Sequence, residues 1–498
     1  MLLRNVATTA IGVIALAVAG ASLGPQWDPL PLTDPLIVSV ASTAIGGSGS
    51  STPIGTYEVT TRVVRVQLSD DVVVEAQISE PVGAPAQRQG VVFIHGAGTG
   101  KFTRAFVQQA HDLASAGIVT MVPNKRLDTY TTRHRDYTAM AADYEKSVEL
   151  LRAQAGVDPA RVGVYGESEG AWIIPIMTAA DPRLAFAALI SAPVVPPREQ
   201  AAFAADSYLR NTDVPGGVFR AIPRAVGMEF PGGGFEYADF DVTPYQRHTT
   251  APVFVAYGTA DASMPTVQGA QQIISDLAVA GNNQYTVRYY AGANHGLRVN
   301  GELAVNLDRD LTRWISTLPV SATAEPRIAG DQPHQAYLAQ PLRTPRWFGD
   351  GDRIVITVIG AAVALVVGAG LCAGTRLFRR RGTGLAPGLV WPMFTLALGA
   401  VLTVVALVVY LVAITRLALD YDQNRWVVQG GWLGVRLLGV ATVVAAAVLT
   451  NRLDDLYRDR ERRAIRGVPA AATMALVVGG STVLLITAAY WGVFQLGI

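Results

Sequence analysis

The 498-residue chain is poor in cysteine and in charged residues, and both shortages limit what it can be. Its one cysteine, Cys372, excludes an internal disulfide framework and a thiolate metal site. Charged residues make up only 16% of the chain, whereas apolar residues make up 50%. That balance is typical of a protein with membrane segments.

The chain also lacks an excess of charge of either sign. Its 40 Lys and Arg residues are balanced by 39 Asp and Glu residues, so no basic face for nucleic acid is predicted. Neither a metal-binding HExxH sequence nor a glycine-rich phosphate loop with lysine is present. We therefore expect no metal and no cofactor.

Long apolar runs, by contrast, are plentiful. A helix needs about 20 apolar residues to cross a bilayer, and five runs are near that length. They predict one helix near the N-terminus and a four-helix transmembrane region over 353–498. The five runs cover residues 6–23, 354–372, 389–414, 432–449 and 470–494.

The loops between the last four runs predict an orientation. The first and third loops are rich in arginine, whereas the second carries Asp420 and Asp422. Because arginine-rich loops stay in the cytoplasm, residues 25–352 and the C-terminus are expected outside. Arg4, before the first run, agrees with a cytoplasmic N-terminus. The loop arginines are Arg376, Arg379, Arg380, Arg381, Arg452, Arg458, Arg460, Arg462, Arg463 and Arg466.

Two membrane features have alternative interpretations. The segment 1–24 resembles a signal peptide in Arg4 and the small residues at 19–21, but its apolar run is longer than a signal peptide needs. We favour an uncleaved anchor. Arg436 lies inside the fourth run, where it either reaches the outer interface or marks a functional site.

Between two linkers lies one domain-sized segment. Residues 25–56 are expected to be a flexible linker because 39–56 are rich in Gly, Ser and Thr, and 319–352 predict a juxtamembrane linker. Residues 57–318 begin with a hairpin, 57–68 and 72–79, and then alternate short apolar strands with helices. This α/β pattern predicts a mostly parallel sheet with helices on both faces and a site at the carboxyl ends of the strands. Strands are expected at 91–94, 118–122, 162–165, 186–190, 253–257 and 285–290, and helices at 104–116, 137–154, from 168 and at 302–318.

A G-x-S-x-G sequence centred on Ser168 lies between the third of these strands and a helix. In that setting the serine occupies a strained turn that presents its hydroxyl above the sheet. The flanking glycines, Gly166 and Gly170, permit the close approach of backbone that the turn needs. Ser168 is therefore the candidate nucleophile.

A serine nucleophile needs a base and an acceptor that orients the base. His295 follows the last strand and Asp261 follows the strand before it, so both lie at carboxyl ends. The order Ser–Asp–His is typical of one hydrolase fold. Two other histidines, His134 and His248, are not excluded by position alone.

The oxyanion of an acyl-transfer reaction needs two amide donors. One should be the N–H of Glu169, after the nucleophile, and the other that of Ala97 or, next, Gly98. His95 is expected to hold this loop rather than act in catalysis. The carboxylates of Glu167 and Glu169 are expected to pair with cations such as Lys125 or Arg126, or to face solvent.

Residues 57–318 resemble the α/β-hydrolase superfamily. The resemblance rests on FIHGAG, YGESEG, YGTAD and ANHG, and it is closest to the dienelactone-hydrolase and serine-aminopeptidase-like branches. It implies a serine hydrolase that is an esterase, thioesterase, acyltransferase or peptidase. The fused membrane region is a departure from soluble members.

In this family a lid is inserted before the acid loop, here at about 193–250. Its aromatic rings either line an acyl pocket or pack the lid onto the domain. They are Phe203, Tyr208, Phe219, Phe230, Phe235, Tyr237, Phe240 and Tyr245.

Together these patterns predict a membrane-anchored, extracytoplasmic serine hydrolase that cleaves a carboxylic ester through an acyl-enzyme. A small-molecule or lipid acyl ester is the expected substrate. Acyl transfer, thioester hydrolysis and peptide hydrolysis use the same residues and stay open. From another class, the membrane region could be a transporter or scaffold with an accessory hydrolase-like module.

Overall fold

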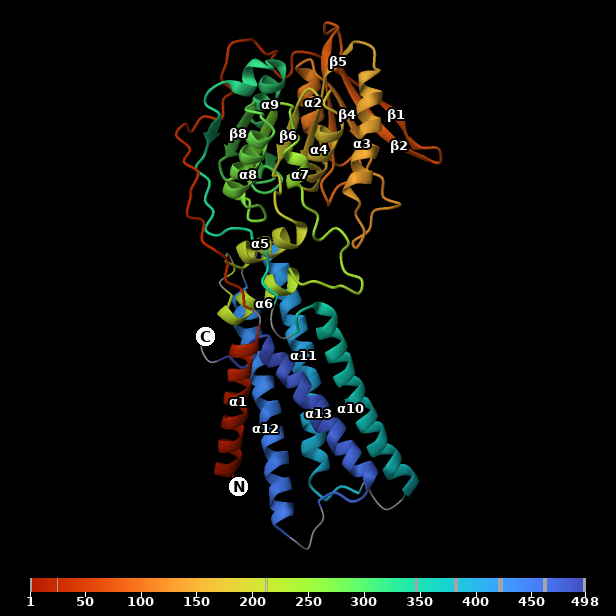
Figure 1. Ribbon diagram of the computed structural model, residues 1–498, viewed down its shortest axis with the longest axis vertical. Coiled ribbons are helices and arrows are strands. Elements are labelled where there is room, and N and C mark those ends of the chain that lie inside the picture. Colours follow the sequence, from red (N-terminus) through yellow and green to blue (C-terminus); the bar gives the residue numbers. More distant parts are fainter. Residues whose placement is uncertain are drawn as a thin grey trace. The chain divides into compact units, whose positions relative to one another are not determined.

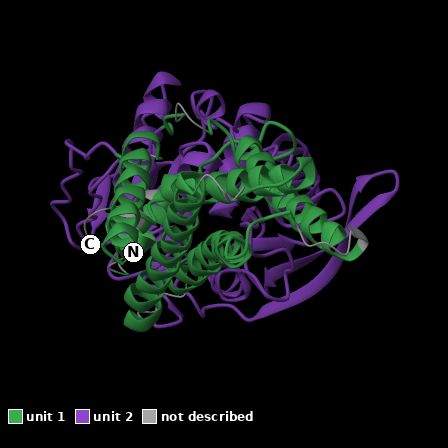
Figure 2. Ribbon diagram, turned by 90° about the horizontal axis from the view of Figure 1, so that it is seen from below, with its two compact units in different colours: residues 1–28, 205–234, 341–498 green, residues 29–204, 235–340 purple. Residues whose placement is uncertain are grey.

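The computed structural model describes residues 2–24, 26–210, 212, 214–344, 348–379, 384–419, 424–459 and 464–495. The chain forms two compact units, coloured separately in Figure 2. Unit 1 comprises residues 1–28, 205–234 and 341–498, and unit 2 comprises residues 29–204 and 235–340. Each unit is therefore assembled from segments that are distant in the sequence.

Unit 2 is built around a nine-stranded sheet with the strand order β1-β2-β4-β3-β5-β6-β7-β8-β11. The neighbours from β4 to β11 pair in parallel, so their carboxyl ends meet at one edge. The predicted hairpin is confirmed, since β1 and β2 pair antiparallel on either side of residues 70–71. The strands are β1 Val59–Ser69, β2 Val72–Pro81, β3 Arg88–Ile94, β4 Val119–Pro123, β5 Val157–Glu167, β6 Ala187–Ile190, β7 Val253–Gly258, β8 Tyr285–Tyr290 and β11 Ile328–Gly330.

Helices cover both faces of this sheet (Figure 1). Side chains alternate along a strand, so β3 places Val91 and Phe93 in one apolar core and Val92 and Ile94 in the other. The helices α2 (Val107–Ser115) and α9 (Leu307–Ser316) contribute to the first core. The second core contains residues of α3 (Tyr137–Arg152), α4 (Glu169–Ala180) and α8 (Thr266–Val279). The predicted α/β architecture is confirmed.

Two short elements were not predicted. A small hairpin pairs β9 (Arg298–Val299) with β10 (Glu302–Leu303), so the closing helix α9 begins at Leu307 rather than at residue 302. Strand β11 pairs with β8 beyond residue 318, the expected end of the domain. The segment expected to be a flexible linker runs beside this edge, where the N–H of Gly330 donates to Val40 O.

In the described part of unit 1, five helices are long and apolar enough to cross a membrane. They correspond to the five predicted runs and support a membrane protein. The helix α1 packs on α12 and α13, and α11 also packs on these two, while α10 packs on α13. The helices are α1 Leu2–Leu23, α10 Gly351–Arg379, α11 Val390–Leu419, α12 Gly431–Arg458 and α13 Val468–Tyr490.

The charged residues used for orientation are described only in part. Within unit 1, the Arg436 guanidinium donates to Gln495 O, 2.5 Å away, near the end of the described chain. This contact agrees with an arginine that reaches out of the apolar segment toward an interface. The residues outside the described ranges are Arg380, Arg381, Asp420, Asp422, Arg460, Arg462 and Arg463.

The segment predicted as a lid, about 193–250, is divided between the two units. It forms α5 (Pro197–Arg210), α6 (Gly216–Val226) and α7 (Thr243–Gln246), and its central residues 205–234 belong to unit 1. Phe203, Phe240 and Tyr245 pack with the core of unit 2, whereas Tyr208 and Phe219 pack with that of unit 1. These contacts support the packing interpretation for those five rings.

Candidate active site

The three candidate catalytic residues follow three parallel strands at one edge of the sheet. Ser168 follows β5, Asp261 follows β7 and His295 follows β8. Strand β6 lies between β5 and β7. Because parallel strands end at the same edge, residues separated by 127 positions along the chain (295 minus 168) are brought to one side of unit 2.

Ser168 lies on a strained turn between β5 and α4. Its backbone angles are φ 55° and ψ −118°, in a region that residues with a side chain rarely adopt. A Cβ at Gly170 would lie 2.5 Å from Ile94 O, and one at Gly166 would lie 2.9 Å from the Gly170 backbone. Only glycine fits at these two positions, as the motif predicted.

Asp261 and His295 form the best-defined contact of the site. His295 Nδ1 lies 2.9 Å from Asp261 Oδ2, and the Asp261 side chain has no exposed surface. The other oxygen of Asp261 accepts from the N–H and the hydroxyl of Ser263 at 2.8 and 2.7 Å. With Nδ1–H directed at a carboxylate, Nε2 carries the free lone pair and can accept a proton.

This contact changes the protonation of both partners. Burial lowers the pKa of His295, but the Asp261 carboxylate and the charge of Glu167 together raise it by more, so the pKa lies above its ordinary value. Burial raises the pKa of Asp261, and the interactions with His295 and Ser263 outweigh it, so the pKa lies below its ordinary value. The pair is thus arranged as a carboxylate that stabilises an imidazolium.

Ser168 and His295 are both bonded to the end of β6. The N–H of Ser168 donates to Ile190 O, at the end of β6, at 2.9 Å. The hydroxyl of Ser191, which follows Ile190, donates to His295 O at 2.7 Å. Within the described residues there is no hydrogen bond between the Ser168 hydroxyl and the imidazole. The structure therefore joins two of the three residues directly and places the third through the shared strand end. Catalytic hydrogen bonds often tighten only when substrate binds.

The alternative histidines have other partners. His134 Nδ1 lies 2.5 Å from a Glu236 carboxylate oxygen, and His248 Nδ1 bonds to Pro244 O. His95 is fully buried, and its Nε2 lies 2.8 Å from Pro123 O. These contacts favour His295 as the base and a structural role for His95.

The proposed oxyanion donors lie on two segments that approach each other. Glu169 is the first residue of α4, where backbone N–H groups have no partner within the helix. Ala97 and Gly98 form an exposed turn after β3. A Cβ at Gly96 would lie 3.1 Å from Glu167 O, so this loop passes close to the strained turn.

The side chain of Glu169 has partners that only partly match the prediction. It pairs with Lys125 at 2.6 Å, as expected, but also with Arg135 at 2.7 Å, which sequence reasoning missed. Arg126 pairs instead with Asp128. Arg135 lies 34 residues before Glu169 in a stretch without regular structure, so no sequence pattern indicated the contact.

Glu167 differs from Glu169. Its carboxylate accepts from the Tyr165 hydroxyl at 2.7 Å, and burial raises its pKa above the ordinary value. Its negative charge also raises the pKa of His295. Glu167 thus adds to the field around the imidazole.

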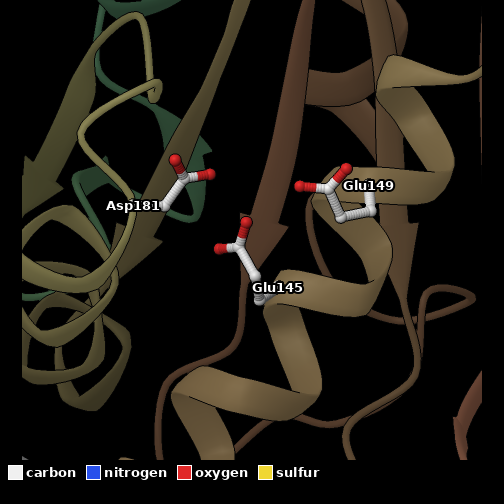
Figure 3. Close-up of side chains that lie close together, drawn as sticks. All are labelled: Glu145, Glu149 and Asp181. Carbon is white, nitrogen blue, oxygen red and sulfur yellow. The ribbon is translucent and has the colours of Figure 1, made fainter.

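Three carboxylates elsewhere in unit 2 lie close enough together to hold a metal ion. Figure 3 shows Glu145 between Glu149 and Asp181, with the oxygens turned toward one another. Arg152 pairs with all three, at 2.5 to 3.5 Å, and Arg183 pairs with Glu149 and Asp181. The positive charge that balances this group is therefore supplied by arginine.

Residues 104–318 match the prolyl oligopeptidase family, peptidase S9. This match includes Ser168, Asp261 and His295 and supports serine hydrolase activity. Among curated protein sequences, no match was found.

Solved structures of hydrolases resemble the chain at low identity. An esterase of Pyrococcus furiosus is 16% identical, covers 52% of this chain and 92% of its own, and has a TM-score of 0.36. A cold-adapted esterase from an Arctic intertidal metagenomic library is 18% identical, with coverage of 54% and 99% and a TM-score of 0.33. A dienelactone hydrolase-like promiscuous phosphotriesterase from metagenomic libraries is 13% identical, with coverage of 52% and 96% and a TM-score of 0.35. Neither the identities nor the TM-scores extend an activity to this chain.

Proposed function

We propose that this protein, an α/β-hydrolase domain joined to a membrane-helix unit, is a serine hydrolase that cleaves a carboxylic ester through an acyl-enzyme. The observation that carries the proposal is the bond between His295 Nδ1 and the buried Asp261 carboxylate. At the same edge of the sheet, Ser168 has the backbone angles of a strand-to-helix turn. Such a set of groups suits nucleophilic attack on a carbonyl.

In the proposed reaction Ser168 Oγ attacks the ester carbonyl while its proton moves to His295 Nε2. The tetrahedral intermediate collapses to a Ser168 acyl ester, and the alcohol leaves with the proton from the imidazolium. Water then attacks the acyl ester, with His295 again accepting a proton and returning it to Ser168. Asp261 stays ionised throughout and stabilises the imidazolium.

The negative charge on the carbonyl oxygen would be held by two backbone donors. We assign these to the N–H of Glu169 and the N–H of Ala97, with Gly98 as the alternative. Removing one such donor costs about 3 kcal/mol of barrier in other hydrolases. Helix α4 also directs its N-terminus at this position, which favours negative charge there.

Five apolar helices support a membrane setting, and a lipid or cell-envelope acyl ester is the substrate class we propose. The arginine-rich loops support an extracytoplasmic hydrolase domain and C-terminus. A labelling experiment with a membrane-impermeant reagent on a cysteine introduced at exposed Val82 would test this orientation, because modification in intact cells requires an outside position.

Peptide hydrolysis is the second candidate, because the family matched by residues 104–318 is a peptidase family. The same residues would attack an amide, with His295 donating a proton to the amine that leaves. Comparing acyl esters with peptide amides that carry the same acyl group would separate the two. A higher kcat/KM on the amides would move the assignment to a peptidase.

The first test is covalent labelling of the full-length protein in detergent with a fluorophosphonate. We expect one adduct on Ser168, located by peptide mass spectrometry, and none in Ser168→Ala. His295→Ala should abolish labelling, whereas His248→Ala, which changes a histidine whose Nδ1 bonds to Pro244 O, should label at the wild-type rate. An adduct on another residue, or labelling that survives Ser168→Ala, would contradict the proposal.

A further inference from the structure

The carboxylate of Glu169 is buried in a set of four hydrogen-bond donors. Its side chain is only 2% exposed, yet it lies on the residue after the candidate nucleophile. One oxygen accepts from Lys125 Nζ at 2.6 Å and from the Tyr130 hydroxyl at 2.9 Å. The other accepts from Arg135 at 2.7 Å and from the Tyr137 hydroxyl at 3.4 Å. Burying a charge is costly unless it is paired and hydrogen-bonded, as it is here.

Lys125 makes a second contact that links this carboxylate to the loop after β3. Its Nζ donates to Gly96 O at 3.0 Å, and the Lys125 side chain is 1% exposed. Gly96 directly precedes Ala97, so the lysine touches the backbone of the loop that carries the second proposed oxyanion donor. One ammonium group therefore holds both segments.

The sheet order explains why a lysine can reach both. Lys125 follows β4, the loop with Ala97 follows β3, and Glu169 follows β5, and these three strands are adjacent in the order β4-β3-β5. Lys125, after β4, therefore bonds to the loop after the middle strand β3. Its other partner, Glu169, follows β5 on the far side of β3. The lysine therefore joins the loop after β3 to the first residue of α4, the two segments that carry the proposed oxyanion donors.

His95 secures the same loop at its start. Its Nε2 bonds to Pro123 O at 2.8 Å and its Nδ1 to the Thr99 hydroxyl at 3.2 Å. Burial lowers the pKa of His95 to about 4, so the ring is neutral near pH 7. Lys125 is the ion-paired contact of this loop, and His95 is the neutral one.

We infer that Lys125 and the Glu169 carboxylate form a positioning pair that sets the spacing of the oxyanion donors. The inference rests on the proposed function and assigns the pair no contact with substrate. Arg135 also pairs with this carboxylate and so helps to fix its position.

The alternative is that the pair only stabilises the fold, and enzyme kinetics separate the two roles. Lys125→Met removes the charge and both hydrogen bonds while keeping an unbranched side chain. We expect kcat for an activated acyl ester to fall about 10- to 100-fold, with KM changed less than about twofold, because the interaction is needed mainly in the transition state. Lys125→Arg should recover part of the loss, because it restores the charge and the donors.

A transition-state analogue provides an independent readout. A trifluoromethyl ketone forms a tetrahedral adduct with serine, so its inhibition constant should rise in parallel with the loss of kcat/KM. Glu169→Gln should show the same pattern, and Lys125→Met/Glu169→Gln should lose no more than the worse single variant, because the two residues act as a unit. All rates are divided by the number of active sites that fluorophosphonate labels at completion.

Arg152→Met is the matched control. It removes a buried cation that pairs with Asp181 at 2.5 Å, but at the end of α3, at the opposite edge of the sheet. It should lower the Tm while leaving kcat and the inhibition constant per active site unchanged. If Lys125→Met behaves in the same way, the inference is overturned. If instead Ser168→Ala retains wild-type turnover, the proposed function itself fails.

Discussion

His295 is held against a carboxylate that has no exposed surface, and under the proposed mechanism this contact sets how activity depends on pH. Neutral imidazole is the form that accepts a proton, so activity is lost as pH falls through the pKa of His295. Because that pKa is raised, we expect the acid limb of kcat/KM to lie above the ordinary value of 6.5. The measurement is a pH–rate profile on a small acyl ester.

The variant Asp261→Asn tests the origin of this shift. It removes the charge that raises the pKa of His295, so the acid limb should move to lower pH. It should also reduce kcat by about 10⁴, the loss seen when the corresponding carboxylate is replaced in another serine hydrolase. An acid limb at the same pH in both proteins would show that Asp261 does not control the imidazole.

The residues of the candidate triad could be named from sequence because each follows a recognisable strand. Ser168, Asp261 and His295 stand at strand ends, and parallel strands must end together. The surroundings of Glu169 could be predicted only in part. The contact with Lys125 was expected, since Lys125 follows a predicted strand, whereas Arg135 approaches from an irregular stretch whose path depends on tertiary packing.

Among the elements, α1 contacts other helices of unit 1 near both of its ends. Near its start the Arg4 guanidinium pairs with Asp454 at 2.8 Å and Asp455 at 2.5 Å on α12. Near its end, Gly20 lies so close to α13 that a Cβ there would be 2.3 Å from Ala489 O. Small residues allow such close helix contacts in membranes. We therefore expect the mature protein to keep α1, with an intact mass that includes residues 1–24.

The close contact at Gly20 predicts opposite effects for two similar substitutions. Gly20→Ala should lower the Tm in detergent, because the new methyl group meets the Ala489 backbone. Gly434→Ala, in α12, meets nothing within 4 Å and should be neutral or stabilising by up to about 1 kcal/mol. Equal shifts in the two variants would argue against close packing of α1 on α13.

The long elements were predictable and the short ones were not. Strands from β3 to β8 and the five long helices have apolar patterns of the right length, and they were located from these patterns. The strands β9, β10 and β11 have two or three residues each, too few to show a period. Their positions depend on pairing partners elsewhere in unit 2. In β11, for example, a Cβ at Gly330 would lie 2.0 Å from Tyr289 O of β8.

At the scale of the whole molecule, the chain crosses between the two units four times, and one crossing pair encloses residues 205–234. The apolar residues Leu209, Val218 and Ile222 of this insert are at most 4% exposed and share a core with Leu484 and Val493 of unit 1. The sequence prediction placed the whole stretch in a lid because the superfamily that the chain resembles inserts a lid at this point, before the acid loop. The pattern of apolar residues shows that a helix has a buried face, but it does not show against which core that face packs.

Because residues 205–234 belong to unit 1, we expect a fragment that contains unit 2 together with this insert to be poorly soluble. A fragment spanning 29–340 keeps the insert but loses the rest of unit 1, so Leu209, Val218 and Ile222 lose their cover. Burial of such side chains contributes roughly 1.5–3 kcal/mol each, which would be lost to water in the fragment. We expect it to aggregate or to require detergent, as measured by size-exclusion chromatography with light scattering.

The matched fragment replaces 205–234 with a flexible Gly/Ser linker and is otherwise identical. Because the nine strands and both cores of the sheet lie in the retained residues, it should elute as a monomer without detergent and unfold cooperatively. A monomeric, detergent-free fragment with the insert intact would contradict the assignment of 205–234 to unit 1. Aggregation of both fragments would show that unit 2 depends on more of unit 1 than this insert.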